Sequence, residues 1–411
     1  MQITWLEMRK ALCSPVILCL LGIFISFNLF TIISGADYRA ELKIVNDIVE
    51  EYGLTFDDSI LKTMQENLNE DVQKFDSQFQ EADVFLQSMT FEKYNIANKD
   101  DQQEIDRIGL IQMYIEMGKS LDERYSELKI DQLRDSIVQE FGLNGITEKF
   151  VTNEYKKLSL RLEEMKENAE YKQWFFASDY RMHTELFRKL MKNIALEGVM
   201  LVVLLTALIV NYEFEHRSQL VTYATKRGRQ LIWNKLMASI LSTLLLLVPL
   251  FGVSLLLFFR VYDYSGLWEV QISSGLNWEY KWPYITWWPI EFHQYLWLAI
   301  AVIVMSLIIV SLLTFTVSIF VKNSYITWIL LISMLVSMYV VPSFFAGIPI
   351  VLILMNFNLT LLLLNPHMYF SGISNLTMFE HHEIITLTCW FVVGVFSSAI
   401  AIRRFYRKDI V

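Results

Sequence analysis

Charged side chains are missing from long stretches of this 411-residue chain. Only 19% of its residues are charged, whereas 54% are hydrophobic. Five runs contain no Asp, Glu, Lys or Arg: residues 11–36, 236–259, 292–321, 323–379 and 384–402. A sixth run, residues 193–212, contains Glu197 as its single charged residue. A helix needs about 20 apolar residues to cross the ~30 Å hydrocarbon layer of a membrane. The runs exclude a wholly soluble enzyme and predict a polytopic membrane protein.

Cysteine and proline are absent from residues 37–192, which contain only five glycines. No disulfide can therefore stabilise this stretch, and that absence favours a bacterial surface over an animal one. The stretch holds most of the charge, with 33 acidic and 21 basic residues, a net of −12; the other 255 residues carry a net of +3. The chain thus divides into a part suited to water and a part suited to lipid.

Apolar residues in this charged stretch recur every three or four positions, as in Leu61, Met64, Leu68 and Val72. That spacing predicts amphipathic helices packed on one another. We expect breaks near residues 53, 95–101 and 142–145, and a last helix continuous with the next membrane crossing. The interspersed charges indicate a solvated helical surface. A site for a cationic ligand is the alternative, and no particular residues are selected for it.

Catalytic motifs are also missing. The chain has no G-x-x-x-x-G-K-[ST] phosphate loop, no G-x-S-x-G elbow and no His/Cys cluster with metal-ligand spacing. His381, His382 and Glu383 are adjacent, but neighbouring residues on a helix point about 100° apart, so we interpret them as boundary residues. No basic face indicates nucleic-acid binding. The sequence predicts no catalytic site, no metal site and no cofactor within this chain.

Ionisable residues are scarce within the predicted crossings. Glu197 and His367 are the only candidates, and both lie near predicted helix ends. Ion-coupled carriers usually place ionisable groups at mid-membrane. The pattern therefore argues against an ion-coupled carrier and favours a pathway driven from elsewhere.

The 57-residue run 323–379 is too long for one crossing. It is interrupted by Pro342, Pro349 and Pro366, and residues 350–364 would span only about 22 Å as a helix. We predict a re-entrant or interfacial segment there. Six crossings then place twelve Lys and Arg residues on the side of both termini, against two in the loop 260–292. Because Lys and Arg collect on the cytoplasmic side, both termini are expected in the cytoplasm.

The predicted fold class is an all-α polytopic membrane protein. It has six transmembrane helices, a re-entrant segment before the last, and a large helical extracytoplasmic domain after the first. The expected units are an interfacial elbow helix 1–15, crossings 16–36, 193–212, 236–259, 293–321, 325–341 and 384–402, the extracytoplasmic domain 37–192, the cytoplasmic loop 213–235, the outer loop 260–292, the re-entrant and outer segment 342–383, and a cytoplasmic tail 403–411.

Tryptophan is concentrated in the predicted outer loop 260–292. The loop carries Trp268, Trp278, Trp282, Trp287 and Trp288. Tryptophan favours the boundary between lipid and water because its ring is apolar and its N–H is polar. We therefore expect an interfacial segment on the outer leaflet, with a gate or binding surface for an amphiphile as the alternative.

The loop 213–235 has an ordered series of features. Its acids come first, a short amphipathic helix follows, a basic turn comes next, and a lysine opens the next crossing; the residues in this order are Glu213, Glu215, Leu220, Tyr223, Arg227, Gly228, Arg229 and Lys235. A short cytoplasmic helix between two crossings is suited to docking a soluble partner. An ordinary positive-inside loop is the alternative.

This order resembles the loop between the second and third crossings of ABC-2-type ABC transporter permeases. In that family, acidic residues precede a coupling helix, a small residue and an arginine follow, and a lysine opens the next helix. Glu213, Glu215, Gly228, Arg229 and Lys235 match those positions. The proline that the family often carries before the arginine turn is absent. Residues 3–12, with Trp5, Met8 and Leu12 on one side, are similar to the family's elbow helix.

The resemblance covers about residues 1–36 and 190–411 and has several implications. A separate ATP-binding-cassette subunit would bind ATP and Mg and hydrolyse ATP. A second permease, identical or related, would complete the transport pathway in the cell (plasma) membrane. The family implies export, and the large aromatic-rich outer part suggests a lipophilic or peptide antimicrobial compound. The alternatives are a membrane-anchored surface receptor or scaffold, and an ion-coupled secondary transporter.

Overall fold

Six helices in the described part of the chain are long and apolar enough to cross a membrane. The computed structural model describes residues 2–36, 39–177, 183–345 and 347–407. The six are α2 (Pro15–Ser34), the stretch Thr184–Glu215, α13 (Leu231–Val261), α15 (Phe292–Val321), the stretch Ser324–Phe345 that begins with α16 (Ser324–Val340), and α19 (His382–Arg407). Each coincides with a predicted crossing. The described residues form helices and no β-strand, so the all-α fold class with six candidate membrane-spanning helices is confirmed.

Two of the long helices form the centre of the bundle. The apolar window of Thr184–Glu215 is 78% buried and that of α15 is 61% buried, against 11–22% for α2, Ser324–Phe345 and α19. α10 (Lys192–Glu215) packs against α13, α15 and α16. The outer helices leave apolar side chains exposed around the bundle, as expected where hydrocarbon replaces water as the solvent.

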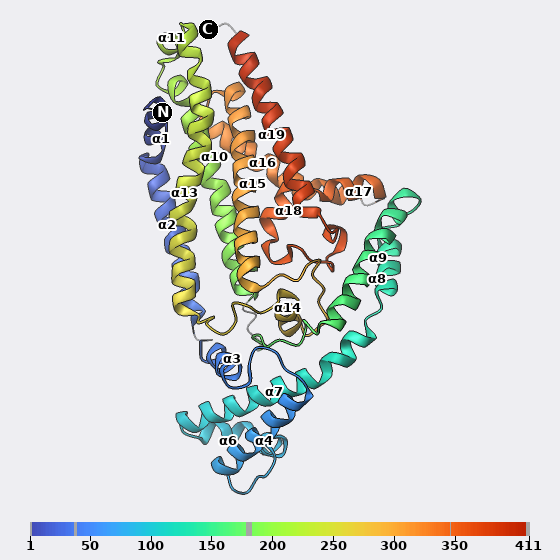
Figure 1. Ribbon diagram of the computed structural model, residues 1–411. Coiled ribbons are helices and arrows are strands. Elements are labelled where there is room, and N and C mark those ends of the chain that lie inside the picture. The colour runs from blue at the N-terminus through green and yellow to red at the C-terminus, as the bar shows by residue number, and fades with distance from the viewer. Residues whose placement is uncertain (1, 37–38, 178–182, 346, 408–411) are drawn as a thin grey trace.

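Both ends of the described chain lie at the same end of the bundle (Figure 1). This terminal end also carries α1 (Gln2–Leu12), α11 (Gln219–Thr222) and α12 (Lys226–Arg229). The opposite, distal end carries the helices that follow α2. An even number of crossings returns a chain to its starting side, so this arrangement agrees with six crossings.

The charged stretch folds into helices, as its periodicity predicts. They are α3 (Arg39–Tyr52), α4 (Asp58–Phe75), α5 (Ala82–Ser88), α6 (Phe91–Ile96), α7 (Lys99–Glu127), α8 (Ile130–Glu140) and α9 (Ile146–Glu167). Breaks fall at the three expected places, and Gly53, Gly142 and Gly145 adopt positive φ angles there. Further breaks at residues 76–81, 89–90 and 128–129 were not expected.

The expected continuity between the last of these helices and the second crossing is wrong. α9 ends at Glu167, and the chain then runs without helix through the buried residues Trp174 and Phe175. The second crossing begins in a π-helix, Thr184–Met191, rather than at residue 193. Glu279 accepts hydrogen bonds from the backbone N–H groups of His183 and Thr184. This carboxylate, distant in sequence, satisfies donors that a helix start leaves open.

The segment between the last two crossings contains two short helices, α17 (Pro349–Asn356) and α18 (Leu359–Leu364). The Asn358 side chain accepts a hydrogen bond from the backbone N–H of Thr360 at 2.8 Å and donates to the carbonyl of Met338, which interrupts the helix. Neither helix is long enough to cross a membrane. α17 lies across the bundle direction in Figure 1. The re-entrant course of residues 350–364 stays a prediction.

Candidate functional site

Five side chains meet at the terminal end and form what we call the terminal charge cluster: Glu7, Lys10, Glu213, Tyr223 and Lys235. The Lys235 ammonium lies 2.6 Å from Glu213 Oε2 and 3.1 Å from Glu7 Oε2. Lys10 Nζ lies 2.6 Å from Glu7 Oε1 and 3.7 Å from Glu213 Oε1. The Tyr223 hydroxyl donates to Glu213 Oε2 at 3.0 Å. The cluster therefore joins α1, α10, the linker after α10, and α13.

Burial makes the pairing in this cluster important for stability. Lys235 is fully buried, and Glu7 and Glu213 are 4% and 3% exposed. A charge removed from water is costly unless an opposite charge and hydrogen bonds compensate for it. Here two cations face two carboxylates, and Lys235 also donates to the backbone carbonyl of Ile209.

The ionisation of the cluster's outer members agrees with this pairing. Burial opposes the charge of Lys10, but the hydrogen bond and charge of Glu7, together with the charge of Glu213, raise its pKa above the ordinary value. Burial and the Glu213 carboxylate raise the pKa of Tyr223 well above its usual range. Lys10 is therefore cationic and Tyr223 is a neutral hydrogen-bond donor at neutral pH.

The linker between α10 and α13 presents apolar side chains to the outside. Leu220 is 59% exposed and Val221 is 85% exposed on the one-turn helix α11. Tyr223, in contrast, is buried. The sequence suggested one amphipathic helix carrying Leu220 and Tyr223, but α11 ends at Thr222. The chain therefore turns Tyr223 inward toward Glu213, away from the exposed pair.

The remaining predicted linker residues have separate roles. Glu215 Oε1 accepts a hydrogen bond from the Ser324 N–H at 2.7 Å, at the start of α16. The Arg229 guanidinium donates to the Tyr406 carbonyl on α19 at 2.7 Å. A Cβ on Gly228 would lie 1.7 Å from the carbonyl oxygen of Thr222, so only glycine fits there. The side chain of Arg227 lies outside the described residues.

Glu7 and Lys10 were not predicted as members of a site. The sequence suggested that one side of residues 3–12 is apolar and carries Trp5, but α1 buries Glu7, Met8 and Ala11 and leaves Trp5 exposed. A lone lysine at the start of an apolar helix needs an acidic partner. The need of Lys235 for an acidic partner identifies Glu7 only once α1 and α13 are known to be neighbours.

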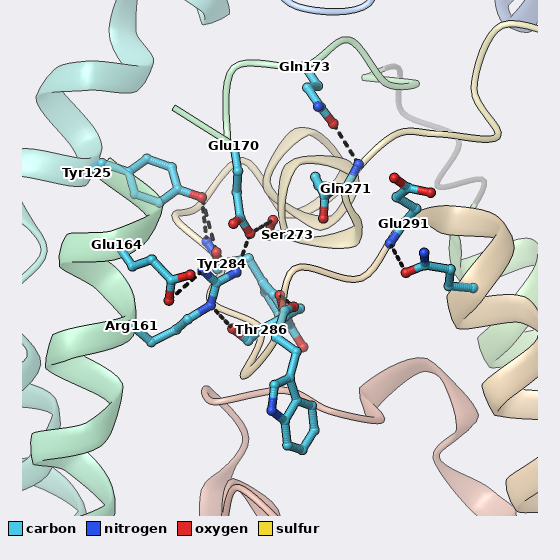
Figure 2. Close-up of polar contacts among 12 residues, drawn as sticks. Tyr125, Arg161, Glu164, Glu170, Gln173, Gln271, Ser273, Tyr284, Thr286 and Glu291 are labelled. Carbon is cyan, nitrogen blue, oxygen red and sulfur yellow. Dashed lines mark hydrogen bonds and ion pairs between the residues drawn. The ribbon is translucent and has the colours of Figure 1, made fainter. Parts of the chain in front are cut away.

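A second polar assembly lies at the distal end, where α9 meets the loop before α15 (Figure 2). The buried Arg161 guanidinium lies 2.6 Å from Glu170 Oε1 and donates to the Thr286 carbonyl at 3.0 Å. Ser273 Oγ donates to the same Glu170 oxygen at 2.8 Å. We call these four residues the distal junction. It attaches the charged helices to the loop between α13 and α15.

The tryptophans of that loop do not form the interfacial belt expected from composition. Trp278, in α14 (Ile272–Tyr280), is fully buried and stacks on Trp174 with ring centroids 5.8 Å apart. Trp287 is buried and donates its indole N–H to the Met378 carbonyl. Trp282 alone of the five is largely exposed. The prediction of an interfacial segment is wrong for Trp278, which packs against the charged stretch, and for Trp287, which packs against the segment before α19.

A buried polar contact also connects three of the crossings. The Asn28 amide on α2 donates to Glu197 Oε2 on α10 at 2.8 Å and to Ser254 Oγ on α13 at 3.3 Å. All three side chains are buried. Glu197 thus accepts a hydrogen bond from the neutral amide of Asn28, in keeping with the rule that polar side chains within a membrane face protein partners.

The two histidines before the last crossing point to different partners. His381 stacks on Trp288, whereas His382 Nε2 lies 3.0 Å from the Asn356 carbonyl. The Glu383 carboxylate accepts the backbone N–H of Phe370 at 2.8 Å. Among the described residues, no group of three or more His, Cys, Asp or Glu could hold a metal ion.

The possible cationic-ligand site has one structural counterpart among the charged helices. A cavity of about 280 Å³ is lined by Asp47, Glu51, Glu70 and Asp71. Its wall also contains Arg107, whose guanidinium lies 2.7 Å from Asp71 Oδ2. Basic side chains within the wall therefore neutralise part of its acidity.

Comparison of the chain with protein-family models, curated proteins and solved structures finds no match. A function for the chain therefore has to follow from its own residues and their geometry.

Proposed function

We propose that this chain is the membrane-spanning permease subunit of an ATP-driven ABC transporter of the ABC-2 type. A separate ATPase subunit docks at the terminal end, which faces the cytoplasm, and a second permease completes the pathway. The distal helices face outward, and the cargo is a lipophilic or peptide compound that is exported. The resemblance of residues 211–235 to the family's coupling loop and the six apolar helices support this proposal.

The main support for the proposal is an exposed apolar pair on a linker that is attached to α10 by a buried hydrogen bond. Leu220 and Val221 project outward, while Tyr223 a few residues on is anchored to Glu213. Apolar anchors surrounded by polar groups typically supply most of the binding energy of a protein interface. A loop that only connects two crossings has no need of a buried attachment.

The attachments of the linker provide a mechanical route from a docked ATPase to the helices. Tyr223 connects it to Glu213 on α10, and Lys235 on α13 pairs with both Glu213 and Glu7 of α1. Arg229 reaches α19, and Glu215 reaches α16. A displacement of the linker would therefore be shared by five helices. Such a displacement can favour one of two bundle arrangements, which is how binding energy drives a conformational change.

The test is co-expression with an ATPase encoded beside this chain and bearing a Walker A motif. The double substitution Leu220→Asp with Val221→Asp places two charges on the proposed docking surface. We expect loss of co-purification and of ATPase stimulation, because apolar anchors at an interface centre cost 2 kcal/mol or more when removed, roughly thirtyfold in affinity. The protein should keep its abundance in the membrane, since both side chains are exposed.

The matched control is Phe91→Asp with Ile96→Asp. These residues are 81% and 85% exposed on α6 at the distal end, so the chemical change is the same and its place differs. The control should keep the ATPase. Equal retention of the ATPase by both double variants would exclude the linker as its docking site. Absence of any ATPase from purified wild type would instead favour a receptor or scaffold.

A further inference from the structure

A cavity of about 570 Å³ lies between the α8–α9 hairpin and the segment that follows α17. Its volume falls within the 300–1,000 Å³ typical of small-molecule sites. One wall comes from Leu133, Ser136 and Ile137 on α8, and another from Leu361 on α18 and Ile373. In Figure 1 the hairpin rises from the distal end toward α17. Two parts of the chain that are far apart in sequence therefore enclose this space.

The two walls are held together by contacts beside the cavity. Lys157 Nζ on α9 lies 2.9 Å from Glu380 Oε2, and Glu154 accepts the Glu380 backbone N–H at 3.0 Å. The rings of Phe150 and Phe379 have centroids 4.8 Å apart. These contacts join α9 to the segment before α19 and so hold the two sides of the cavity in place.

The chemistry of the lining differs from that of the surrounding helices. Among the described residues that line the cavity there is no Asp, Glu, Lys or Arg. Apolar side chains such as Leu133 and Leu361 alternate with neutral polar ones such as Ser136, Asn365 and Thr377. A charged group brought here would lose its hydration, and no side chain of the lining would pair with it. The cost is largest for a cation, because the charges of Arg188 and Lys192 lie near His367. The lining favours a ligand with no net charge.

His367 is a polar side chain in the wall of this cavity, and its Nδ1 is buried within that wall. Its side chain is 8% exposed and lines the cavity, and its Nδ1 has no hydrogen-bond partner among the described residues. Burial, together with the nearby charges of Arg188 and Lys192, lowers the pKa of His367 to about 4, so the ring is neutral.

The helix beside the cavity exposes apolar side chains. Ile350 and Leu354 on α17 are largely exposed, while Asn356 at the end of the same helix lines the cavity. Exposed apolar residues of a multi-pass protein normally contact lipid. The cavity therefore adjoins a surface from which a lipid-soluble molecule can enter.

We propose that this cavity binds an uncharged amphiphile that enters from the lipid phase, with its apolar part between α8 and α18 and its hydrogen-bonding head beside His367. That this amphiphile is the class of compound transported rests on the proposed function. Binding itself needs neither ATP nor a partner, so it can be measured on the full chain alone.

The test uses the full-length protein in lipid vesicles and a monoacylglycerol that carries a photoreactive diazirine in its acyl chain. After illumination, labelled peptides are identified by mass spectrometry. We expect labelling of peptides that contain residues 133–137 and 361–376. An alkylammonium with the same diazirine should label these peptides far less, because its charge has no acidic partner in the lining and lies near the cations Arg188 and Lys192.

Ile137→Trp fills the cavity and should reduce labelling of these peptides about tenfold, equivalent to 1.4 kcal/mol of binding. The matched control is Leu160→Trp, because Leu160 is 73% exposed on α9 and does not line the cavity. His367→Gln should keep labelling and His367→Phe should reduce it. Thermal melting of each variant identifies any that is misfolded. Labelling is then compared between wild type and the remaining cavity variants.

Three results would overturn the inference: equal labelling of Ile137→Trp and wild type, labelling confined to α16 and α19, or equal labelling by the alkylammonium. None of them depends on the ATPase. Failure of ATPase docking with intact labelling would reject the permease proposal and leave the cavity site standing. The reverse outcome would reject the cavity site alone.

Discussion

Replacement of Lys235 by methionine is the most direct test of the terminal charge cluster. Methionine has a similar length but no charge, so the change leaves the Glu7 and Glu213 carboxylates buried without the cation that lies within 3.1 Å of both. Removing one partner of a buried ion pair typically costs about 3–5 kcal/mol. Lys10 remains close to both carboxylates and is half-exposed, so we expect a loss near the lower limit, about 3 kcal/mol.

The loss is measured as the change in free energy of unfolding in a denaturant titration of the purified protein. The matched control is the triple variant Lys235→Met, Glu7→Gln and Glu213→Gln, which removes the unpaired charges together with the cation. Because neutral groups cost less to bury than unpaired charges, the triple variant should recover most of the stability. Unchanged stability of Lys235→Met, or a triple variant no better than the single one, would refute the assignment of this cluster as a compensated buried network.

Three further outcomes are expected. Gly228→Ala should increase proteolysis of the linker and weaken ATPase co-purification, because a Cβ there collides with a backbone oxygen; wild-type proteolysis would contradict this. Asn28→Val should lower the free energy of unfolding by about 1–3 kcal/mol, since Glu197 loses its hydrogen bond, and Asn28→Gln should lower it less; equal losses would argue against that bond. Burial lowers the pKa of His183 to about 3 and of His367 to about 4, below the unfolded value of about 6.5. Their contribution to stability is therefore complete above pH 6.5 and is lost toward pH 4, and the denaturation midpoint of His367→Gln should fall less with pH than that of wild type.

The sequence determined the helical and membrane-spanning character of this protein. Charge-free runs of about 20 residues predict crossings because insertion depends on the hydrophobicity of each segment by itself. The same local logic located the breaks after α3, α6 and α8, where glycine or polar residues end the apolar periodicity. These properties depend on neighbours within a few positions along the chain.

The tertiary structure decided which distant groups became partners. Glu7 pairs with Lys235, and Glu279 begins the second crossing at Thr184 instead of residue 193. Nothing in the local sequence distinguishes these carboxylates from solvated ones. Their pairing depends on helix packing that brings residues more than 90 positions apart within about 3 Å, the range of a hydrogen bond.

Burial of aromatic side chains was likewise decided by packing. Trp278 has the composition of an interfacial residue, yet the helices of the charged stretch cover it; Tyr223 turns inward because α11 ends one residue before it. Hydropathy describes how strongly a side chain prefers to leave water. It does not distinguish contact with lipid from burial inside the protein. That choice depends on the shape of the surfaces that meet around the side chain, and this shape arises only when the whole chain has folded.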